Sequence, residues 1–213
     1  MQKYIKLTSQ RYQDVALRVI PGHFATPNSH VNYYMDMAAI KSRMTEARAA
    51  ARALSEAYYS SHPVDTIVCM DGTEVIGAYL AEEMTSVGVI SMNRHKSIYV
   101  LTPEYNSSGQ MIFRNNLQEW IKDKNVLLLL ASATTGKTVA QAVETLKYYG
   151  ATIVGISALF SVATKIAGLP VHSLFTPADL PDYTAYNHDD CPLCRKGEAV
   201  DALCNGYGYT PLR

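Results

Sequence analysis

Five adjacent residues near the middle of the chain combine hydroxyl, amide and cationic groups: Thr134, Thr135, Gly136, Lys137 and Thr138. An apolar run at residues 126–130 precedes them, and apolar residues at positions 139, 143 and 146 follow at helical spacing. Backbone amides at a helix N-terminus lack partners within the helix, and the helix dipole favours a negative charge beside them. Together with Ala133, these residues form the threonine loop, whose pattern predicts an anion-binding site. An ordinary strand-to-helix turn with a threonine cap is the alternative interpretation.

The elements around the threonine loop form a strand–helix–strand unit. The apolar run at residues 126–130 predicts a strand that is buried on both faces, as in a parallel sheet. Gly150 predicts the end of the helix, and a second apolar run at residues 153–159 predicts the next strand. We expect the connection to be right-handed, as in nearly all proteins. In an open α/β sheet, ligands bind at the carboxyl ends of the strands.

The composition limits the partners of the chain. Lysine plus arginine and aspartate plus glutamate each total 19 of 213 residues, so no net charge attracts nucleic acid or an anionic membrane. With 48% hydrophobic and 18% charged residues, the composition is typical of a single globular domain. No apolar run approaches the ~20 residues that span a bilayer, and the N-terminus lacks a secretory apolar segment. We therefore expect a cytoplasmic protein without nucleic-acid or membrane partners.

The remaining chain predicts further elements. Residues 1–20 are expected to form a short amphipathic helix with apolar residues near its end, and apolar spacings of three and four predict a long helix over residues 37–60. Residues 64–70 and 87–91 predict strands, and a helix is expected to follow the first of them as far as Met84. The polar segment 102–110, with Pro103 and Gly109, predicts a mobile flap.

Two protein families have loops of this type. The sequence ASATTGKT at residues 131–138 fits a loosened Walker A pattern, in which Lys137 would contact the terminal phosphates of a nucleotide. TTGKT at residues 134–138 and GATIVG at residues 150–155 instead resemble the type I phosphoribosyltransferases, where a TTGGT-like loop precedes a helix and a GAxVVG strand.

A second, upstream match favours the transferase family. Residues 22–36 resemble the orotate phosphoribosyltransferase signature GHFxLxSGxHSxxYxD through Gly22, His23, Phe24, His30, Tyr34 and Asp36. A P-loop protein has no reason to carry this signature. The resemblance covers about residues 20–200 and implies one domain over residues 1–213, with an open parallel sheet of the type I phosphoribosyltransferase fold. It divides the domain into an N-terminal hood element at 1–36, a core sheet at 60–160 and a C-terminal extension at 162–213.

The resemblance also implies ligands and partners. The expected ligand is a phosphorylated small molecule, either phosphoribosyl pyrophosphate (PRPP) with Mg²⁺ or a nucleoside monophosphate. Pyrophosphate would contact the loop that contains Gly72, Thr73 and Glu74, in which Thr73 replaces the usual proline. The basic segment, formed by Arg94, His95 and Lys96, would reach into the site of the neighbouring subunit in a homodimer and bind the pyrophosphate there. A solvated turn explains this basic segment equally well. His30 and Tyr34 are further candidates for substrate binding.

The chain differs from the resembling family at positions that bind substrate in that family. Leu130 and Ala131 stand where the family has two consecutive acids that hold the ribose hydroxyls of PRPP. Each lost hydrogen bond between a carboxylate and a hydroxyl typically removes about 1.5–3 kcal/mol of interaction free energy. Pro27 replaces a common lysine, and Ser161-Val162 replaces an Asp-Arg pair.

Two hypotheses for the function follow from these matches and differences. The first is an orotate phosphoribosyltransferase-like enzyme of pyrimidine nucleotide biosynthesis, and the second is a non-catalytic sensor that binds a phosphometabolite or nucleotide. Neither hypothesis assigns a catalytic residue.

A CxxC motif lies near the C-terminus. Cys191-Pro-Leu-Cys194 resembles a CPLC segment found in one subgroup of orotate phosphoribosyltransferases. Cys204 and His188 are close enough in sequence to complete a four-ligand zinc site. Packed, reduced thiols are the favoured interpretation of these cysteines, and zinc is the alternative.

Overall fold

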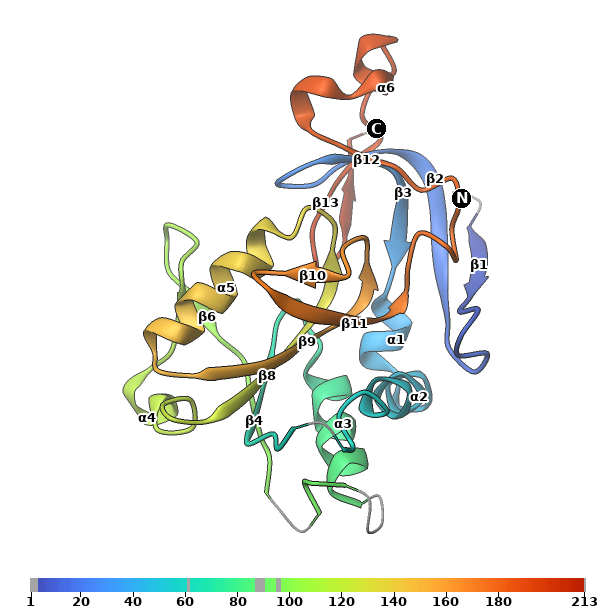
Figure 1. The fold of residues 1–213 in the computed structure, drawn as a ribbon. Coiled ribbons are helices and arrows are strands. Elements are labelled where there is room, and N and C mark those ends of the chain that lie inside the picture. Colours follow the sequence, from blue (N-terminus) through green and yellow to red (C-terminus); the bar gives the residue numbers. More distant parts are fainter. Residues whose placement is uncertain (1–3, 61, 87–90, 95–96, 213) are drawn as a thin grey trace.

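The computed structural model describes residues 4–60, 62–86, 91–94 and 97–212. Its core is a sheet with the strand order β10-β11-β9-β8-β4-β5, in which every pair except β10–β11 is parallel (Figure 1). The strands of this core sheet are β4 Thr66–Cys69, β5 Tyr99–Leu101, β8 Asn125–Ala133, β9 Thr152–Ser161, β10 Lys165–Ile166 and β11 Leu169–Phe175. The predicted strand–helix–strand unit therefore lies at the centre of the sheet, and the core sheet extends past residue 160 because β11 pairs with β9.

A second sheet joins the two ends of the chain. Its strand order is β12-β3-β2-β13-β14, and β1 pairs with β2 beside this path. The bounds are β1 Ile5–Thr8, β2 Ala16–Ala25, β3 His30–Asp36, β12 Ala185–Tyr186, β13 Ala202–Cys204 and β14 Tyr209–Pro211. The expected hood element and C-terminal extension thus form one unit, because β13 runs parallel to β2 and continues the same ladder.

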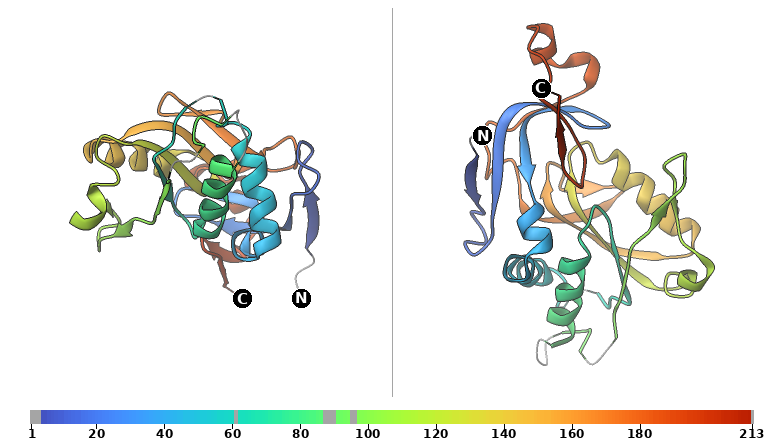
Figure 2. Two further views of the ribbon diagram at one scale, coloured as in Figure 1. Left: turned by 90° about the horizontal axis from the view of Figure 1, so that it is seen from below. Right: turned by 180° about the vertical axis from the view of Figure 1, so that it is seen from behind.

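Helices cover both faces of the core sheet. In the described residues, the helices are α1 Ala38–Ser42, α2 Met44–Ser55, α3 Glu74–Ser86, α4 Asn115–Gln118, α5 Lys137–Tyr148 and α6 Pro192–Arg195, with a short 3-10 helix at His188–Asp190. Helices α2 and α3 lie side by side, and α6 stands away from the core sheet (Figures 1 and 2).

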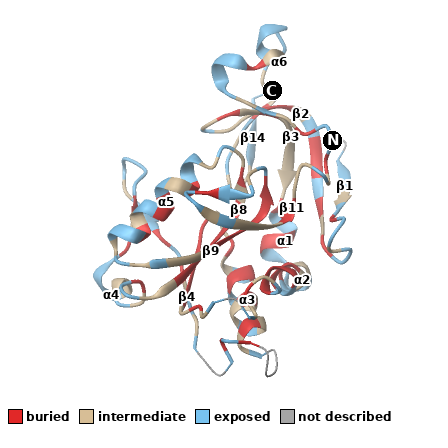
Figure 3. Cartoon of the chain, viewed as in Figure 1, coloured by how far each residue is buried: buried red, intermediate tan, exposed pale blue. Residues whose placement is uncertain are grey.

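The alternating side chains of β8 explain this arrangement. Leu127 and Leu129 pack into a cluster with residues of α2, α3 and β2. Leu128 and Leu130 point the other way, into a cluster with residues of α5. Successive side chains of a strand face opposite sides, so an all-apolar strand requires a cover on each face. The buried residues gather where the core sheet meets these helices (Figure 3).

The prediction of a helix over residues 1–20 is wrong. Val15, Leu17 and Val19 are buried, whereas Arg18 between them is exposed. This spacing of two residues is the period of a strand with one buried face, and β2 pairs here with β1 and β3.

The structure also modifies other predicted elements. The long helix over residues 37–60 is divided into α1 and α2 at Arg43, which has extended backbone angles (φ −94°, ψ 126°), and Met44 is exposed. The flap at residues 102–110 begins a two-stranded hairpin of β6 Glu104–Tyr105 and β7 Met111–Ile112. Most of the strand expected at residues 87–91 lies outside the described residues. No helix within the described ranges is long and apolar enough to cross a membrane.

A buried hydrogen bond between two elements provides a test of the core. The Tyr58 hydroxyl lies 2.8 Å from Ser157 Oγ on β9, and Tyr58 is 1% exposed. Tyr58→Phe leaves the Ser157 hydroxyl without this partner, so we expect a loss of about 1–3 kcal/mol in the free energy of unfolding, measured with urea. The control Tyr148→Phe, on a side chain that is 86% exposed, should change stability by less than about 0.5 kcal/mol. Equal effects of the two substitutions would contradict this assignment.

Candidate functional site

A cavity of 260 Å³, the main pocket, opens at the carboxyl ends of β4 and β8, where the core sheet meets the second sheet. Its size is close to the lower end of small-molecule sites, which span about 300–1,000 Å³. The threonine loop forms one wall, and the tip of the β2–β3 hairpin, the end of β4 and the turn between β13 and β14 form the others. The pocket therefore lies at the edge where the parallel sheet predicts ligand binding.

The threonine loop leaves backbone amides without protein partners just before α5. Helix α5 begins directly after Gly136, whose φ of +73° lies in the left-handed region that favours glycine. Within the described ranges, no protein group accepts a hydrogen bond from the backbone amides of Thr134, Thr135 or Gly136. All six loop residues from Ala133 to Thr138 line the main pocket, and Asn28 Nδ2 donates to Thr138 Oγ1 across it (3.3 Å). Unpaired amide donors thus belong to residues that line the pocket.

The two positions that carry acids in the resembling family are apolar and buried here. Leu130 and Ala131 line the pocket and are each 2% exposed. Neither side chain carries a hydrogen-bonding group. The part of the pocket beside the end of β8 therefore has no carboxylate from β8 itself.

Lys41 is a buried cation at the opposite side of the pocket. It is 7% exposed, and its Nζ donates to the carbonyl oxygens of Asp71 (2.8 Å) and Gly206 (2.6 Å). Burial lowers the Lys41 pKa, while the nearby carboxyls of Asp71, Glu74 and Asp36 raise it. An ammonium group has three donors, and two of them bind these carbonyls. Lys41 thereby fastens the end of β4 to the turn between β13 and β14.

Asp71 is the only carboxylic acid that lines the pocket in the described part of the chain. Its backbone has φ +58°, and its Oδ2 accepts a hydrogen bond from the Ala131 amide (3.4 Å). Burial raises the Asp71 pKa, whereas the Ala131 amide and Lys41 lower it. A side chain on Gly206 would come within 2.4 Å of Asp71 Oδ1, so only glycine fits there. Asp71 thus places one carboxyl beside the apolar end of β8.

Two tyrosines border the same region. Tyr34, from β3, lines the pocket, and burial raises its pKa to about 12. Burial, followed by the charges of Asp71 and Tyr207, raises the pKa of Tyr105 to about 12. Tyr105 belongs to the β6–β7 hairpin, which therefore lies close to Asp71. Both phenols remain hydrogen-bond donors at neutral pH.

Several predicted contact residues do not line the pocket. Thr73 is buried, and its hydroxyl donates to the Met70 carbonyl oxygen (2.8 Å); Glu74 accepts a hydrogen bond from Thr102 (3.2 Å). The adjacent Gly72 also lies outside the lining, so the β4–α3 loop contributes Asp71 in their place.

The basic segment lies elsewhere. Arg94 is exposed, and the Asn93 side chain beside it binds the Val64 amide, near the start of β4 and thus opposite the pocket. His95 and Lys96 lie outside the described residues.

Around the CxxC motif, the structure gathers other residues than Cys204 and His188, which the sequence offered as further zinc ligands. Cys191 and Cys194 do lie together, but their histidine neighbours are His23 and His30. Cys204 lies in the lining of the main pocket. His188 Nε2 lies 3.0 Å from the Thr26 carbonyl oxygen, and neither His188 nor Cys204 belongs to the group. His30 consequently lies in this cluster and not in the pocket.

Lys41 and Asp71 are the site residues that sequence reasoning missed. Lys41 follows Ile40 but lies off the apolar stripe of the predicted helix, so no pattern indicated its burial. Asp71 directly follows an apolar strand, and ligands of open α/β sheets bind at the carboxyl ends of the strands. A signal was therefore present for Asp71, but neither residue belongs to a recognised motif.

The sequence of the chain is similar to proteins named orotate phosphoribosyltransferase. No protein-family model matches it. Orotate phosphoribosyltransferase from Chlorobium phaeobacteroides is 25% identical over 185 residues, which cover 86% of this chain and 88% of the relative. Orotate phosphoribosyltransferase from Wolinella succinogenes is 25% identical over 206 residues, which cover 90% of this chain and 94% of the relative. The similarity thus extends over nearly the whole chain.

Solved structures share its fold. Orotate phosphoribosyltransferase from Mycobacterium tuberculosis H37Rv, in complex with Fe(III) dicitrate, aligns with a TM-score of 0.53 and 18% identity over 77% of this chain and 92% of that chain. The same protein in complex with PRPP aligns with a TM-score of 0.51 and 16% identity over 69% of this chain and 82% of that chain. These likenesses confirm the predicted type I phosphoribosyltransferase fold.

The buried carboxyl of Asp71 gives a pH-dependent prediction. Because burial raises its pKa above the unfolded value, the neutral form stabilises the folded chain below the unfolded pKa, and this stabilisation is lost as the pH rises through the folded pKa. Asp71→Asn keeps the shape but cannot ionise. In urea unfolding from about pH 4 to 7, we expect the stability of the wild type to fall relative to the variant as the pH rises. A constant difference between them, as expected for the exposed control Asp14→Asn, would contradict the effect of burial.

Proposed function

We propose that this chain, a divergent relative of the orotate phosphoribosyltransferases, binds a phosphorylated ribose compound in the main pocket and transfers its ribosyl group weakly or not at all. The observation that carries the proposal is the combination of a threonine loop with unpaired amides and an adjacent strand end without acids. The ligand phosphate would bind the loop at the N-terminus of α5, where amide donors and the helix dipole favour an anion.

The charge distribution supports a phosphate as the bound group. Lys41 and Lys137 line the pocket together with one carboxyl, Asp71, and burial favours the neutral form of that carboxyl. Thr134, Thr135 and Thr138 add hydroxyl donors on the same wall. The structurally similar protein of M. tuberculosis was solved with PRPP, which supports PRPP or a nucleoside monophosphate as the ligand class.

The apolar end of β8 argues against efficient transfer. Moving a ribosyl group requires stabilisation of an oxocarbenium-like sugar and of the departing pyrophosphate. Leu130 and Ala131 offer neither a charge nor a side-chain acceptor to the ribose hydroxyls. The pocket thus keeps the groups suited to bind a phosphate and lacks the pair suited to stabilise the sugar, which favours a sensor or regulatory protein.

Thr135→Ala tests the binding site. A hydrogen bond to a charged group contributes about 1.5–3 kcal/mol, so we expect roughly ten- to a hundredfold weaker binding in calorimetric titrations with PRPP plus Mg²⁺ or with orotidine 5′-monophosphate. Thr152→Ala, at the opposite end of the core sheet, should bind like the wild type. Unchanged affinity of Thr135→Ala would exclude the threonine loop as the phosphate site, and binding of ATP alone would favour a nucleotide-binding protein.

Gly136 is a less suitable position for this test. An added side chain would lie 3.2 Å from Ile166 and would hold a left-handed backbone, which costs about 1–2 kcal/mol in stability. A loss of binding in Gly136→Ala would therefore mix a fold defect with a binding defect.

Phosphoribosyl transfer to a pyrimidine such as orotate is the second candidate function, and Asp71 is the observation that favours it. Its carboxyl lies 3.4 Å from the Ala131 amide, beside the missing acid pair. Magnesium usually binds through one or two carboxylates and the phosphates of a substrate, so Asp71 fits as the single protein carboxylate for a magnesium ion bound with PRPP. Transfer would break the bond from ribose C1 to pyrophosphate and join C1 to a ring nitrogen of the base.

Pyrophosphate release distinguishes the two candidates. The protein is incubated with PRPP, Mg²⁺ and orotate or uracil, and the released pyrophosphate is measured. We expect little or no base-dependent release above background. If release occurs and Asp71→Asn abolishes it while Asp14→Asn does not, the second candidate is correct and Asp71 replaces the lost acids.

The family resemblance also supports a homodimer. Arg94 lies at the opposite end of β4 from the pocket of its own chain, so a role for this basic segment requires the pocket of a neighbouring subunit. Light scattering of the purified protein measures this state directly, and a monomeric mass would exclude the proposed role of Arg94.

A further inference from the structure

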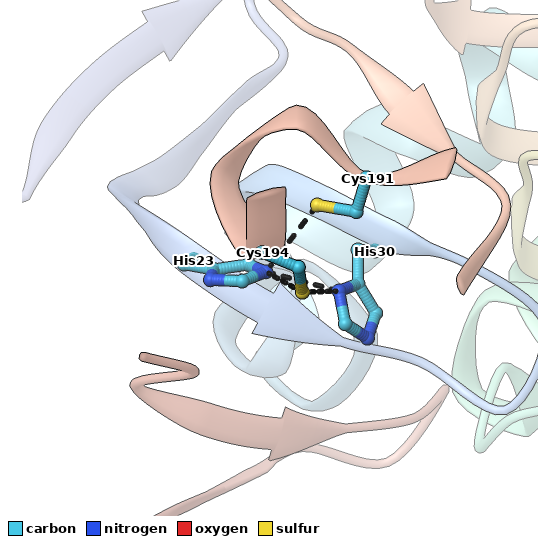
Figure 4. Close-up of side chains that lie close together, drawn as sticks. All are labelled: His23, His30, Cys191 and Cys194. Atoms are coloured by element: carbon cyan, nitrogen blue, oxygen red, sulfur yellow. Dashed lines mark hydrogen bonds between the residues drawn. The ribbon is translucent and has the colours of Figure 1, made fainter. Parts of the chain in front are cut away.

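Four metal-binding side chains converge outside the main pocket: His23, His30, Cys191 and Cys194. Each offers one ligand atom, and all four atoms lie within 4.8 Å of one another. Figure 4 shows both sulfur atoms and both imidazole rings directed toward a common centre. This group is the His2Cys2 cluster.

The cluster joins two distant parts of the chain. His23 lies on β2 and His30 on β3, so both belong to one hairpin of the second sheet. Cys191 directly precedes helix α6, and Cys194 lies within it. This helix stands away from the core sheet (Figures 1 and 2). Beyond the cluster, the His23 amide donates to Asp201 Oδ2 (2.8 Å), and the Asp201 amide donates to the His23 carbonyl oxygen (2.7 Å).

We propose that the His2Cys2 cluster is a structural zinc site. Tetrahedral zinc with bond lengths of about 2.3 Å to sulfur and 2.0–2.1 Å to nitrogen separates its ligands by about 3.3 Å for two nitrogens and about 3.5 Å for nitrogen and sulfur. Here His23 Nε2 lies 2.9 Å from His30 Nδ1 and 3.5 Å from Cys191 Sγ. Cys194 Sγ lies 3.7 Å from His23 Nε2 and 3.3 Å from His30 Nδ1. Small shifts of the side chains convert this arrangement into a tetrahedron.

The hydrogen bonding of His23 favours the ligand form of its ring. His23 Nδ1 lies 3.0 Å from the Glu198 carbonyl oxygen, to which only a protonated ring nitrogen donates. In the neutral ring, Nε2 then carries the free lone pair, and it points into the cluster. A backbone carbonyl on the second ring nitrogen is the usual support of a zinc-bound histidine.

The donor types favour zinc over other metals and over packed thiols. Two thiolates and two imidazoles in a tetrahedral arrangement are typical of structural zinc, whereas Mg²⁺ prefers oxygen ligands. Hydrogen bonds between thiols and imidazoles satisfy pairs of these groups, but they do not require all four atoms to converge. Four protein ligands leave no open position for a substrate, so the metal has a structural role.

The site would fix the hairpin that forms one wall of the main pocket. Thr26, Pro27 and Asn28 lie between the two histidines, and all three line the pocket. Asn28 reaches Thr138 of the threonine loop from this hairpin tip. A zinc ion would therefore join the α6 segment to the hairpin and hold Asn28 opposite the loop. The zinc site does not require the ligand that we propose for the main pocket.

Metal analysis of the purified full-length chain tests the proposal. We expect about one zinc per chain, and we expect Cys191→Ser and Cys194→Ser each to lose this stoichiometric zinc. Cys204→Ser is the matched control and should retain it, because Cys204 lies outside the cluster. Zinc that is absent from the wild type, or that is retained by both cluster variants, would overturn the proposal.

Cobalt substitution provides a readout in the wild-type protein, so it does not depend on the folding of a variant. Wild-type protein stripped with a chelator and loaded with Co²⁺ should show the visible absorption of a tetrahedral site and the near-ultraviolet absorption of thiolate-to-cobalt charge transfer. Zinc should displace the cobalt and raise the melting temperature of the stripped protein. Spectra of an octahedral cobalt ion, or a Cys191–Cys194 disulfide that persists until reductant is added, would contradict the zinc assignment.

Discussion

The parallel pairing of β8 on both of its edges is the constraint on which the other features depend. Because β4 and β9 flank it and helices cover both faces, residues 126–131 are all nearly inaccessible to solvent. A strand enclosed in this way must be apolar, and its carboxyl end must open at the sheet edge. The threonine loop and the N-terminus of α5 follow directly from that end. The position of the main pocket is therefore a consequence of the core and not a separate feature.

The same constraint explains how the chain tolerates Leu130 and Ala131. Both residues extend the apolar pattern of β8 into the two clusters that cover the core sheet. Carboxylates at these positions would have to be desolvated or paired, which makes an acid pair costly unless a ligand or metal compensates. Leu130 and Ala131 avoid this cost, and they leave the end of β8 without side-chain acceptors.

The second sheet links the pocket to the His2Cys2 cluster. The β2–β3 hairpin carries His23 and His30 at the base of its turn and the pocket residues at its tip. Lys41 provides a comparable link on the other side, where it joins the end of β4 to the turn between β13 and β14. Segments from both ends of the chain, the β2–β3 hairpin and the turn between β13 and β14, thus line the pocket opposite the core sheet.

The sequence by itself determined the strand–helix–strand unit, the threonine loop, the resemblance to the orotate phosphoribosyltransferases and the absence of an acid pair at residues 130–131, because each rests on adjacent residues with a local physical meaning. Only the tertiary structure decided which distant residues meet. It placed Asp71 beside Ala131, joined Lys41 to Gly206, and replaced Cys204 and His188 by His23 and His30 around the CxxC motif. Sequence proximity misled in the last case, because a sheet ladder between β2 and β13 brings residues near position 23 next to the C-terminal segment. The prediction of a helix over residues 1–20 is wrong for a related reason. The alternation of apolar residues stabilises a strand only when partner strands pair with it and one face is covered.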